Sequence, residues 1–177
     1  ESLGMKVIYY DIVDKLSIGN AKKHDSLDSI LKESDIVSLH VDGREDNTNL
    51  IGEREINLMK EKSILINYSR GNIVNINALK ENLLNNKLMG AAIDVFPKEP
   101  LNNSEKFESS LRGIKNLILS PHIGGSTKEA QENIGAYVPD KIIDFINTGN
   151  TSSCVNFPDL SLPEQKDSHR LIHIHNN

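Results

Sequence analysis

The segment SILINYSRGNIVNINALKENLLNNKLMGAAIDVF, residues 63–96, contains two short apolar runs separated by an amphipathic one. Ser63–Tyr68 and Gly90–Phe96 have the length and apolar character of buried strands. Between them, Ile76–Lys87 carries apolar residues at helical spacing. A strand, a helix and a strand in this order predict two parallel strands joined by a right-handed crossover.

The same alternation continues on both sides of this segment. Further apolar runs bounded by turn residues predict strands, amphipathic runs predict helices, and one long polar stretch predicts a loop. The strands are Lys6–Tyr10, Asp35–Val41 and Asn116–Ser120, the helices Ser26–Ser34 and Glu53–Lys62, and the loop Pro97–Gly113. Strands that alternate with helices indicate an α/β protein with a doubly wound parallel sheet.

A different pattern begins at Ser126, a suitable helix N-cap that is followed three residues later by Glu129. It predicts a helix that runs to Asn147, is stopped by Gly149 and is bent by Pro139. Beyond it, the polar residues 150–168 predict an extended segment and a linker, and Ile172–His175 alternates like an edge strand.

Composition excludes several classes of function. Twenty basic and 25 acidic residues give a net charge of −5, and no segment gathers the basic residues that nucleic-acid binding requires. No apolar run approaches the roughly 18–20 residues of a membrane-spanning helix. The single cysteine, Cys154, allows neither an internal disulfide nor a cysteine-rich zinc site, so we expect a cytoplasmic protein without a metal.

The chain opens on Glu1, without an initiator methionine, and its predicted last strand stops before any partner strand. We therefore expect that both ends are cut.

Ligands of an open parallel sheet bind beyond the carboxyl ends of its strands. The residues at or just after those ends include Arg70, Glu99 and His122, an anion-binding group, a carboxylate and an imidazole. Together they can reduce a 2-keto acid: Arg70 would bind the substrate through two parallel hydrogen bonds, and His122 would deliver a proton. Glu99 would fix the tautomer of His122 and favour its protonated form.

Each of these residues alone has a plainer interpretation. A histidine after a strand is more often a hydrogen-bonded loop residue, and both Arg70 and Glu99 are ordinary turn or loop charges. Their shared place at strand ends favours the catalytic interpretation. Asp11 is equally compatible with a turn residue and with the acid that binds the adenosine ribose of NAD. The glycine-rich phosphate loop should precede Asp11 by about 20 residues, so we expect it upstream of residue 1.

Three stretches resemble one protein family closely. These are SRGNIV at residues 69–74, GAAIDVF at residues 90–96 followed by Glu99-Pro100, and SPHIGGST at residues 120–127. With them, the chain resembles the D-isomer-specific 2-hydroxyacid dehydrogenases nearly from end to end. The later EAQENIG at residues 129–135 and the closing HIHNN at residues 173–177 are similar to its serine-regulated bacterial branch.

The resemblance implies catalytic roles for Arg70, Glu99 and His122. It implies cofactor-binding residues as well: Asp11 at the ribose, Asp94 near the nicotinamide carboxamide, and His40, Val41, Ser69 and Gly124 lining the NAD pocket. Two positions depart from the family pattern, since Asp42 stands where a proline is usual and Tyr68 where a small residue is usual.

The activity implied is NAD-dependent oxidation of 3-phosphoglycerate to 3-phosphohydroxypyruvate, the first committed step of L-serine synthesis. The domains implied are a partial NAD-binding domain at 1–125, a connecting helix with part of a substrate domain at 126–166, and the start of an ACT regulatory domain at 167–177. His175 and Asn177 match the serine-binding entrance of that domain, where chains pair into a homo-oligomer. The alternatives are another D-2-hydroxyacid dehydrogenase and a non-enzymatic, NAD(H)-sensing corepressor on the same scaffold.

Overall fold

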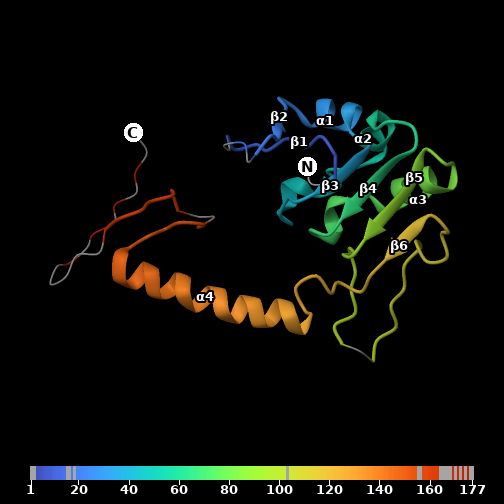
Figure 1. Cartoon of the computed structure of the whole chain (residues 1–177). Helices are drawn as coiled ribbons and strands as arrows, with labels where there is room; N and C mark the ends of the chain where they lie inside the picture. Colours follow the sequence, from blue (N-terminus) through green and yellow to red (C-terminus); the bar gives the residue numbers. More distant parts are fainter. Residues whose placement is uncertain are drawn as a thin grey trace. The chain divides into compact units, whose positions relative to one another are not determined.

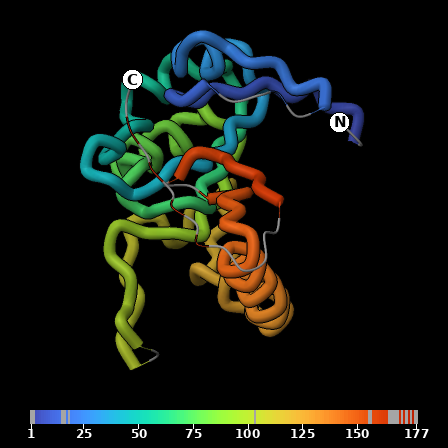
Figure 2. Tube along the Cα trace, turned by 90° about the vertical axis from the view of Figure 1, so that its left-hand side faces the viewer, coloured from blue at the N-terminus to red at the C-terminus, as the bar shows by residue number. Residues whose placement is uncertain are grey.

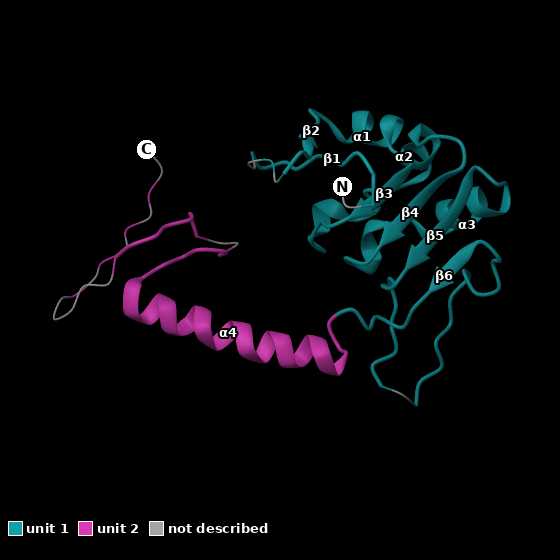
Figure 3. Ribbon diagram, viewed as in Figure 1, with its two compact units in different colours: residues 1–124 teal, residues 125–177 magenta. Residues whose placement is uncertain are grey.

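The structure is a computed structural model that describes residues 3–14, 17, 19–102, 104–154, 157–163, 169, 171, 173 and 175. The chain divides into two compact units, Glu1–Gly124 and Gly125–Asn177 (Figure 3).

The first unit alternates strands and helices (Figure 1). In chain order its elements are β1 (Ile8–Tyr9), β2 (Lys22–Lys23), α1 (Leu27–Glu33), β3 (Ile36–Leu39), the 3-10 turn η1 (Glu45–Asn47), α2 (Glu53–Leu58), β4 (Ser63–Asn67), the 3-10 turn η2 (Gly71–Ile73), α3 (Ile76–Leu84), β5 (Leu88–Ile93) and β6 (Leu117–Leu119).

Four of the strands form one parallel sheet in the order β3-β4-β5-β6. The register places Leu65 of β4 beside Val37 of β3 and beside Ala91 of β5. β1 and β2 form a separate parallel pair. The predicted parallel α/β sheet is confirmed, and because all four strands run the same way, their carboxyl ends lie along one edge.

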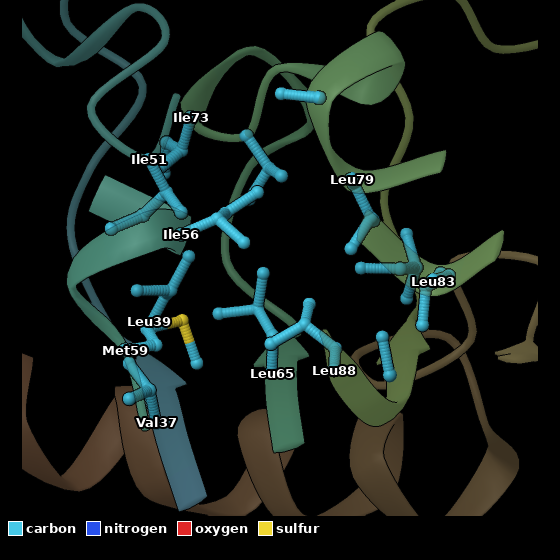
Figure 4. Packing of buried hydrophobic residues seen from close by; sticks show 14 of the residues in the cluster. Val37, Leu39, Ile51, Ile56, Met59, Leu65, Ile73, Leu79, Leu83 and Leu88 are labelled. Atoms are coloured by element: carbon cyan, nitrogen blue, oxygen red, sulfur yellow. The ribbon is translucent and has the colours of Figure 1, made fainter. Parts of the chain in front are cut away.

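One face of the four-stranded sheet packs against the helices (Figure 4). Every second residue of β4 is buried, so Leu65 meets the helices while its neighbours turn to the other face. Ile56 and Met59 at α2 and Leu79 and Leu83 of α3 complete this core, and each is at most 2% exposed. The apolar spacing predicted for α3 places Leu79 and Leu83 on its buried face, whereas Leu84 of the same predicted stripe is 59% exposed.

The ends of the elements differ from prediction by a few residues. α3 stops at Leu84 rather than Lys87 because Asn86 adopts a left-handed backbone with φ of 58°. α2 stops at Leu58 rather than Lys62, since Met59 turns to extended backbone. β2 was not predicted: its two exposed lysines show no apolar pattern, and Lys22 N donates to Val7 O.

The predicted loop between β5 and β6 is confirmed, and its described residues extend away from the sheet in two perpendicular views (Figures 1 and 2). Its base is fixed by aromatic contact, with the rings of Phe96 and Phe107 centred 4.6 Å apart in an edge-to-face arrangement. Leu111 is fully buried near the other end of the loop. The segment that carries Glu99 is thus attached to the core on both sides.

The second unit contains α4 (Lys128–Thr148). The prediction of Ser126 as N-cap is wrong by one residue: Thr127 caps the helix, and its hydroxyl accepts a hydrogen bond from Ala130 N at 3.1 Å. Gly149 ends the helix as predicted, with a left-handed φ of 75°. The helix continues through Pro139 without interruption. The bend expected near Ala136 stays a prediction.

After α4 the chain folds back on itself through Thr151. Its backbone N–H donates to Leu160 O, and its hydroxyl donates to Pro158 O at 2.6 Å. Residues 155, 156 and 164–168 of the predicted extended segment and linker, and half of the predicted strand Ile172–His175, lie outside the described residues. Within the described part of the chain, no helix is both long and apolar enough to span a membrane.

Candidate active site

A buried asparagine organises the turn that follows β4. Asn67 is 1% exposed, and its Oδ1 accepts hydrogen bonds from the backbone N–H and the hydroxyl of Ser69. Its Nδ2 donates to Arg70 O at 3.0 Å. Both side-chain groups of Asn67 are satisfied, so the turn that presents Ser69 and Arg70 is fixed from beneath. Sequence reasoning missed Asn67, although a polar residue closing an apolar strand was the available signal.

Arg70 is exposed at the end of this turn. Its Nη1 donates to its own neighbour Ser69 O at 2.7 Å, and the described part of the chain forms no ion pair with its guanidinium. Arg70 can therefore accept a carboxylate from outside the chain without breaking an existing ion pair.

Gly71 allows the Arg70 turn to approach the segment that leads to Glu99. A Cβ built on Gly71 would lie 2.0 Å from the carbonyl carbon of Phe96 and 2.6 Å from Pro97 N. No side chain fits in this space, so the backbones of the two segments touch because residue 71 is a glycine. The contact places the turn of Arg70 next to the base of the loop that carries Glu99.

Glu99 and His122 form a hydrogen-bonded pair across 23 residues of sequence. Glu99 Oε2 lies 2.8 Å from His122 Nδ1. The other carboxylate oxygen accepts from Phe96 N, also at 2.8 Å, which fixes the plane of the carboxylate. The pair thus matches the predicted arrangement of an acid that orients an imidazole ring.

The backbone at His122 is strained. Its φ is 54°, in the left-handed region that residues other than glycine seldom adopt. Such conformations cost of order 1–3 kcal/mol and persist where surrounding contacts enforce them. The contact with Glu99 is one such constraint, and Asp94 supplies others further along the loop.

Asp94 holds the loop that follows His122. It is 2% exposed, and its two carboxylate oxygens accept from the backbone N–H groups of Ile123 and Gly124, each at 3.3 Å. Both carboxylate oxygens of this buried side chain are therefore satisfied by hydrogen bonds. The structure therefore brings together Asp94 and Gly124, two of the predicted cofactor-binding residues.

The pKa of Glu99 lies below the ordinary value for a glutamic acid. Partial burial acts to raise it, but hydrogen bonds from His122 and Phe96 N and the charge of His122 outweigh that effect. Glu99 is therefore ionised at neutral pH and can stabilise a positive charge on the ring of His122.

Hydrogen bonds hold Asp42, which departs from the family pattern, within the loop after β3. Its carboxylate receives two hydrogen bonds from the Arg44 guanidinium, at 2.7 and 2.5 Å, and a third from Asn47 Nδ2 at 3.0 Å. These bonds lower the pKa of Asp42 to about 2. A side-chain clamp thus fixes the loop where a proline ring is usual. The neighbouring Gly43 lies against the Arg70 side chain, since a Cβ there would be 3.0 Å from Arg70 Cγ.

Asp11 follows β1, and His40 and Val41 follow β3, as predicted. His40 Nε2 lies 2.9 Å from the Ser38 hydroxyl, and Val41 is 36% exposed. Asp11 Oδ1 accepts from Val13 N at 2.8 Å, the geometry of a turn.

The two predicted serine-binding residues lie near the end of the second unit. His175 is exposed, with its ring centred 5.0 Å from that of His173, and Asn177 lies outside the described residues. In the described part of the chain, no three His, Cys, Asp or Glu side chains gather as metal ligands would.

Similarity to known proteins agrees with this geometry. The family model described as D-isomer specific 2-hydroxyacid dehydrogenase, NAD binding domain, matches residues 1–124. The D-3-phosphoglycerate dehydrogenase of Haemophilus influenzae is 52% identical over 177 residues, which are 100% of this chain and 43% of that protein. The protein of the same name from Dictyostelium discoideum is 48% identical over 100% of this chain and 44% of its own length. The chain thus spans less than half the length of these curated relatives.

Solved structures show the same fold. D-2-hydroxyisocaproate dehydrogenase superposes with a TM-score of 0.72 at 35% identity, over 85% of this chain and 48% of that chain. The NAD complex of a D-isomer specific 2-hydroxyacid dehydrogenase from Lactobacillus delbrueckii ssp. bulgaricus gives a TM-score of 0.67 at 30% identity, over 80% of this chain and 47% of that one.

These similarities confirm the predicted Rossmann-type fold and NAD as the cofactor of the family. The conclusion rests on the matched domain, which covers well over half of the sequence. The chain belongs to the D-isomer specific 2-hydroxyacid dehydrogenases.

Proposed function

We propose that the protein containing this chain oxidises 3-phosphoglycerate to 3-phosphohydroxypyruvate with NAD, and that Arg70, Glu99 and His122 carry out the chemistry. The 2.8 Å pair of Glu99 and His122, beside the turn of Arg70, is the observation that carries the proposal. The name shared by the relatives at 52% and 48% identity supports the substrate.

Arg70 would bind the substrate carboxylate. Its planar guanidinium offers two parallel N–H donors, and the described chain leaves it without an ion-pair partner. Anchored from beneath by Asn67, the turn can hold the hydroxyl-bearing carbon of the substrate in one orientation.

His122 would take the proton of the substrate hydroxyl as hydride leaves the same carbon. The carbon–hydrogen bond breaks, the C=O bond forms, and the proton passes to the imidazole. The carboxylate of Glu99, 2.8 Å from Nδ1, stabilises the imidazolium so formed. In the reverse direction His122 returns the proton to the keto oxygen.

The chemistry of the available groups fits NAD. Asp11 stands at the carboxyl end of β1, where an exposed carboxylate can accept from both ribose hydroxyls and would repel a 2′-phosphate. Asp94, Ser69, Gly124, His40 and Val41 are the residues of this chain that we propose to line the rest of the cofactor site. When bound, NAD supplies the hydride acceptor.

The direct test is the appearance of NADH absorbance when the natural protein containing this chain meets NAD and 3-phosphoglycerate. Absorbance with this substrate supports the proposal. Absorbance only with another D-2-hydroxy acid would identify a different dehydrogenase, and cofactor binding without turnover would favour the corepressor alternative.

Replacing Arg70 with lysine is expected to lower kcat/KM for the hydroxy acid by roughly tenfold or more, because a point ammonium cannot form two parallel hydrogen bonds. Steady-state kinetics at saturating NAD measure the effect. Equal kcat/KM in the two proteins would show that Arg70 acts as a simple charge or does not touch the substrate.

Replacing Asp11 with alanine is expected to raise the Kd of NAD several-fold and to narrow the preference for NAD over NADP, since the ribose hydroxyls lose an acceptor and the 2′-phosphate loses a repelling charge. Titrations with both cofactors measure the ratio. An unchanged ratio would leave Asp11 as the turn residue that its hydrogen bond to Val13 N describes.

We also propose that residues 126–166 form a connecting helix and the C-terminal part of a substrate domain. We propose further that residues 167–177 begin a regulatory ACT domain that binds L-serine through His175 and Asn177 in a homo-oligomer. The HIHNN sequence supports this assignment. Cys154, the single cysteine of the sequence, is free and exposed, which supports our proposal that the protein is located in the cytoplasm. Inhibition of NADH formation by L-serine, absent in a His175→Ala variant, is the test.

A further inference from the structure

The side chain of Tyr68 connects the strand that leads to Arg70 with the strand that leads to His122. Ser120 Oγ donates to Tyr68 Oη at 3.4 Å. Tyr68 stands two residues before Arg70, and Ser120 two residues before His122. The two ends of this contact therefore belong to the two segments that carry the proposed catalytic groups.

The contact crosses the carboxyl end of β5. Because β5 lies between β4 and β6 in the sheet, a side chain that extends from β4 to the end of β6 must pass over the strand between them. Asp94, the residue that holds the His122 loop, follows the last residue of β5, and its N–H donates to Asn67 O. The Tyr68 ring consequently lies at the edge of the sheet where ligands bind.

Packing alone does not explain this aromatic residue. Tyr68 is 49% exposed although neighbouring Asn67 is 1% exposed, so the ring offers much of its surface to whatever occupies the site. The 3.4 Å separation of the hydroxyls is long for a strong O–H···O bond, so Ser120 orients the ring more than it stabilises the fold.

We propose that the Tyr68 ring contacts the nicotinamide of bound NAD and favours its oxidised, positively charged form over the reduced, neutral form. This inference rests on the proposed function, because hydride transfer requires the nicotinamide to lie beside the carbon held between Arg70 and His122. The face of a phenol ring carries negative potential and attracts a cation within about 6 Å of its centre.

The expected result concerns the ratio of two dissociation constants, Kd for NAD⁺ divided by Kd for NADH. In a Tyr68→Leu variant this ratio should rise about fivefold, since leucine keeps an apolar side chain and removes the π-face. Tyr68→Phe keeps the face and should leave the ratio within about twofold of the wild type. NADH fluorescence gives one constant directly, and displacement of NADH by NAD⁺ gives the other.

Two further variants make the test selective. Met89→Ala removes another exposed apolar side chain, at the amino end of β5, and should leave the ratio unchanged. Ser120→Ala keeps the Tyr68 ring but removes the hydrogen bond to the Tyr68 hydroxyl. The ratio of dissociation constants should therefore rise by less than in Tyr68→Leu. This variant preserves the test if the leucine substitution impairs folding.

The outcomes separate this inference from the proposed function. Wild-type protein that binds neither NAD⁺ nor NADH would overturn both. Normal binding of both cofactors with the same ratio in wild type, Tyr68→Leu and Ser120→Ala would overturn the role of Tyr68 alone. A ratio that rises equally in Tyr68→Leu and Tyr68→Phe would also overturn it, because the hydroxyl and not the ring would then be responsible.

Discussion

A His122→Ala variant of the natural protein is expected to turn over 3-phosphoglycerate roughly 10²–10⁴-fold more slowly, the usual contribution of a positioned general acid or base. The alanine removes the group that takes the hydroxyl proton, but it leaves Arg70 and the proposed cofactor contacts in place. The fall should therefore appear in kcat, with a smaller change in the Kd of NAD. Stopped-flow or steady-state measurement of NADH formation, with a separate cofactor titration, distinguishes the two quantities.

His24→Gln is the matched control for this variant. His24 is a half-buried histidine of the same unit whose Nδ1 lies 3.3 Å from Ser29 Oγ, outside the proposed site. Its replacement should leave kcat unchanged. Wild-type turnover in His122→Ala would remove His122 from the mechanism, whatever the control shows.

Glu99 should be required for the proton transfer to His122 throughout the neutral pH range. Its folded-state pKa is lowered, so the hydrogen bonds of its carboxylate stabilise the fold above the unfolded pKa, and this contribution is lost as pH falls through the folded pKa. The carboxylate is therefore present throughout the neutral range. Glu99→Gln keeps the size of the side chain without the charge that stabilises the imidazolium, and it should share the kcat defect of His122→Ala in part.

The parallel sheet could be predicted because it depends on local pattern. Apolar runs such as Ser63–Tyr68, separated by an amphipathic helix, allow few arrangements other than parallel strands. The rule that ligands bind at the carboxyl ends then selects Arg70, Glu99 and His122. The observed 2.8 Å contact between Glu99 and His122 shows that the selection identified real spatial neighbours.

Residues that act through close approach could not be found in this way. Asn67 bonds to Ser69 and Arg70, which are its neighbours in the sequence, but its burial depends on packing that exists only in the folded chain. Tyr68 could be noticed as a departure from the family pattern, but its contact with Ser120 crosses a strand that sequence spacing does not reveal. β2 escaped prediction because two exposed lysines carry no periodic signal.

Gly71 also acts through close approach of two segments, and its replacement has the largest expected effect on stability. In Gly71→Ala the new Cβ would lie 2.0 Å from the Phe96 carbonyl carbon and 2.1 Å from its oxygen. Both atoms belong to the backbone, so the clash cannot be relieved by rotating a side chain. We expect a loss of about 3 kcal/mol or more in the free energy of unfolding, at the upper end of overpacking costs. Urea denaturation at unchanged m-value measures it.

The displaced backbone also carries the hydrogen bond from Phe96 N to Glu99, so this variant links stability to catalysis. Moving that segment shifts Glu99 and its partner His122 relative to Arg70, and misplacement by about 1 Å can cost about 10²-fold in rate. Gly135→Ala is the control, because nothing beyond the adjacent residues and the helix's own backbone lies within 4 Å of its Cβ position, and alanine is the better helix former. Its stability should be equal or slightly higher. If Gly71→Ala matched this control in stability and activity, the segments of Arg70 and Glu99 would not touch as the structure has them, and the proposed convergence of the three catalytic groups would lose its physical basis.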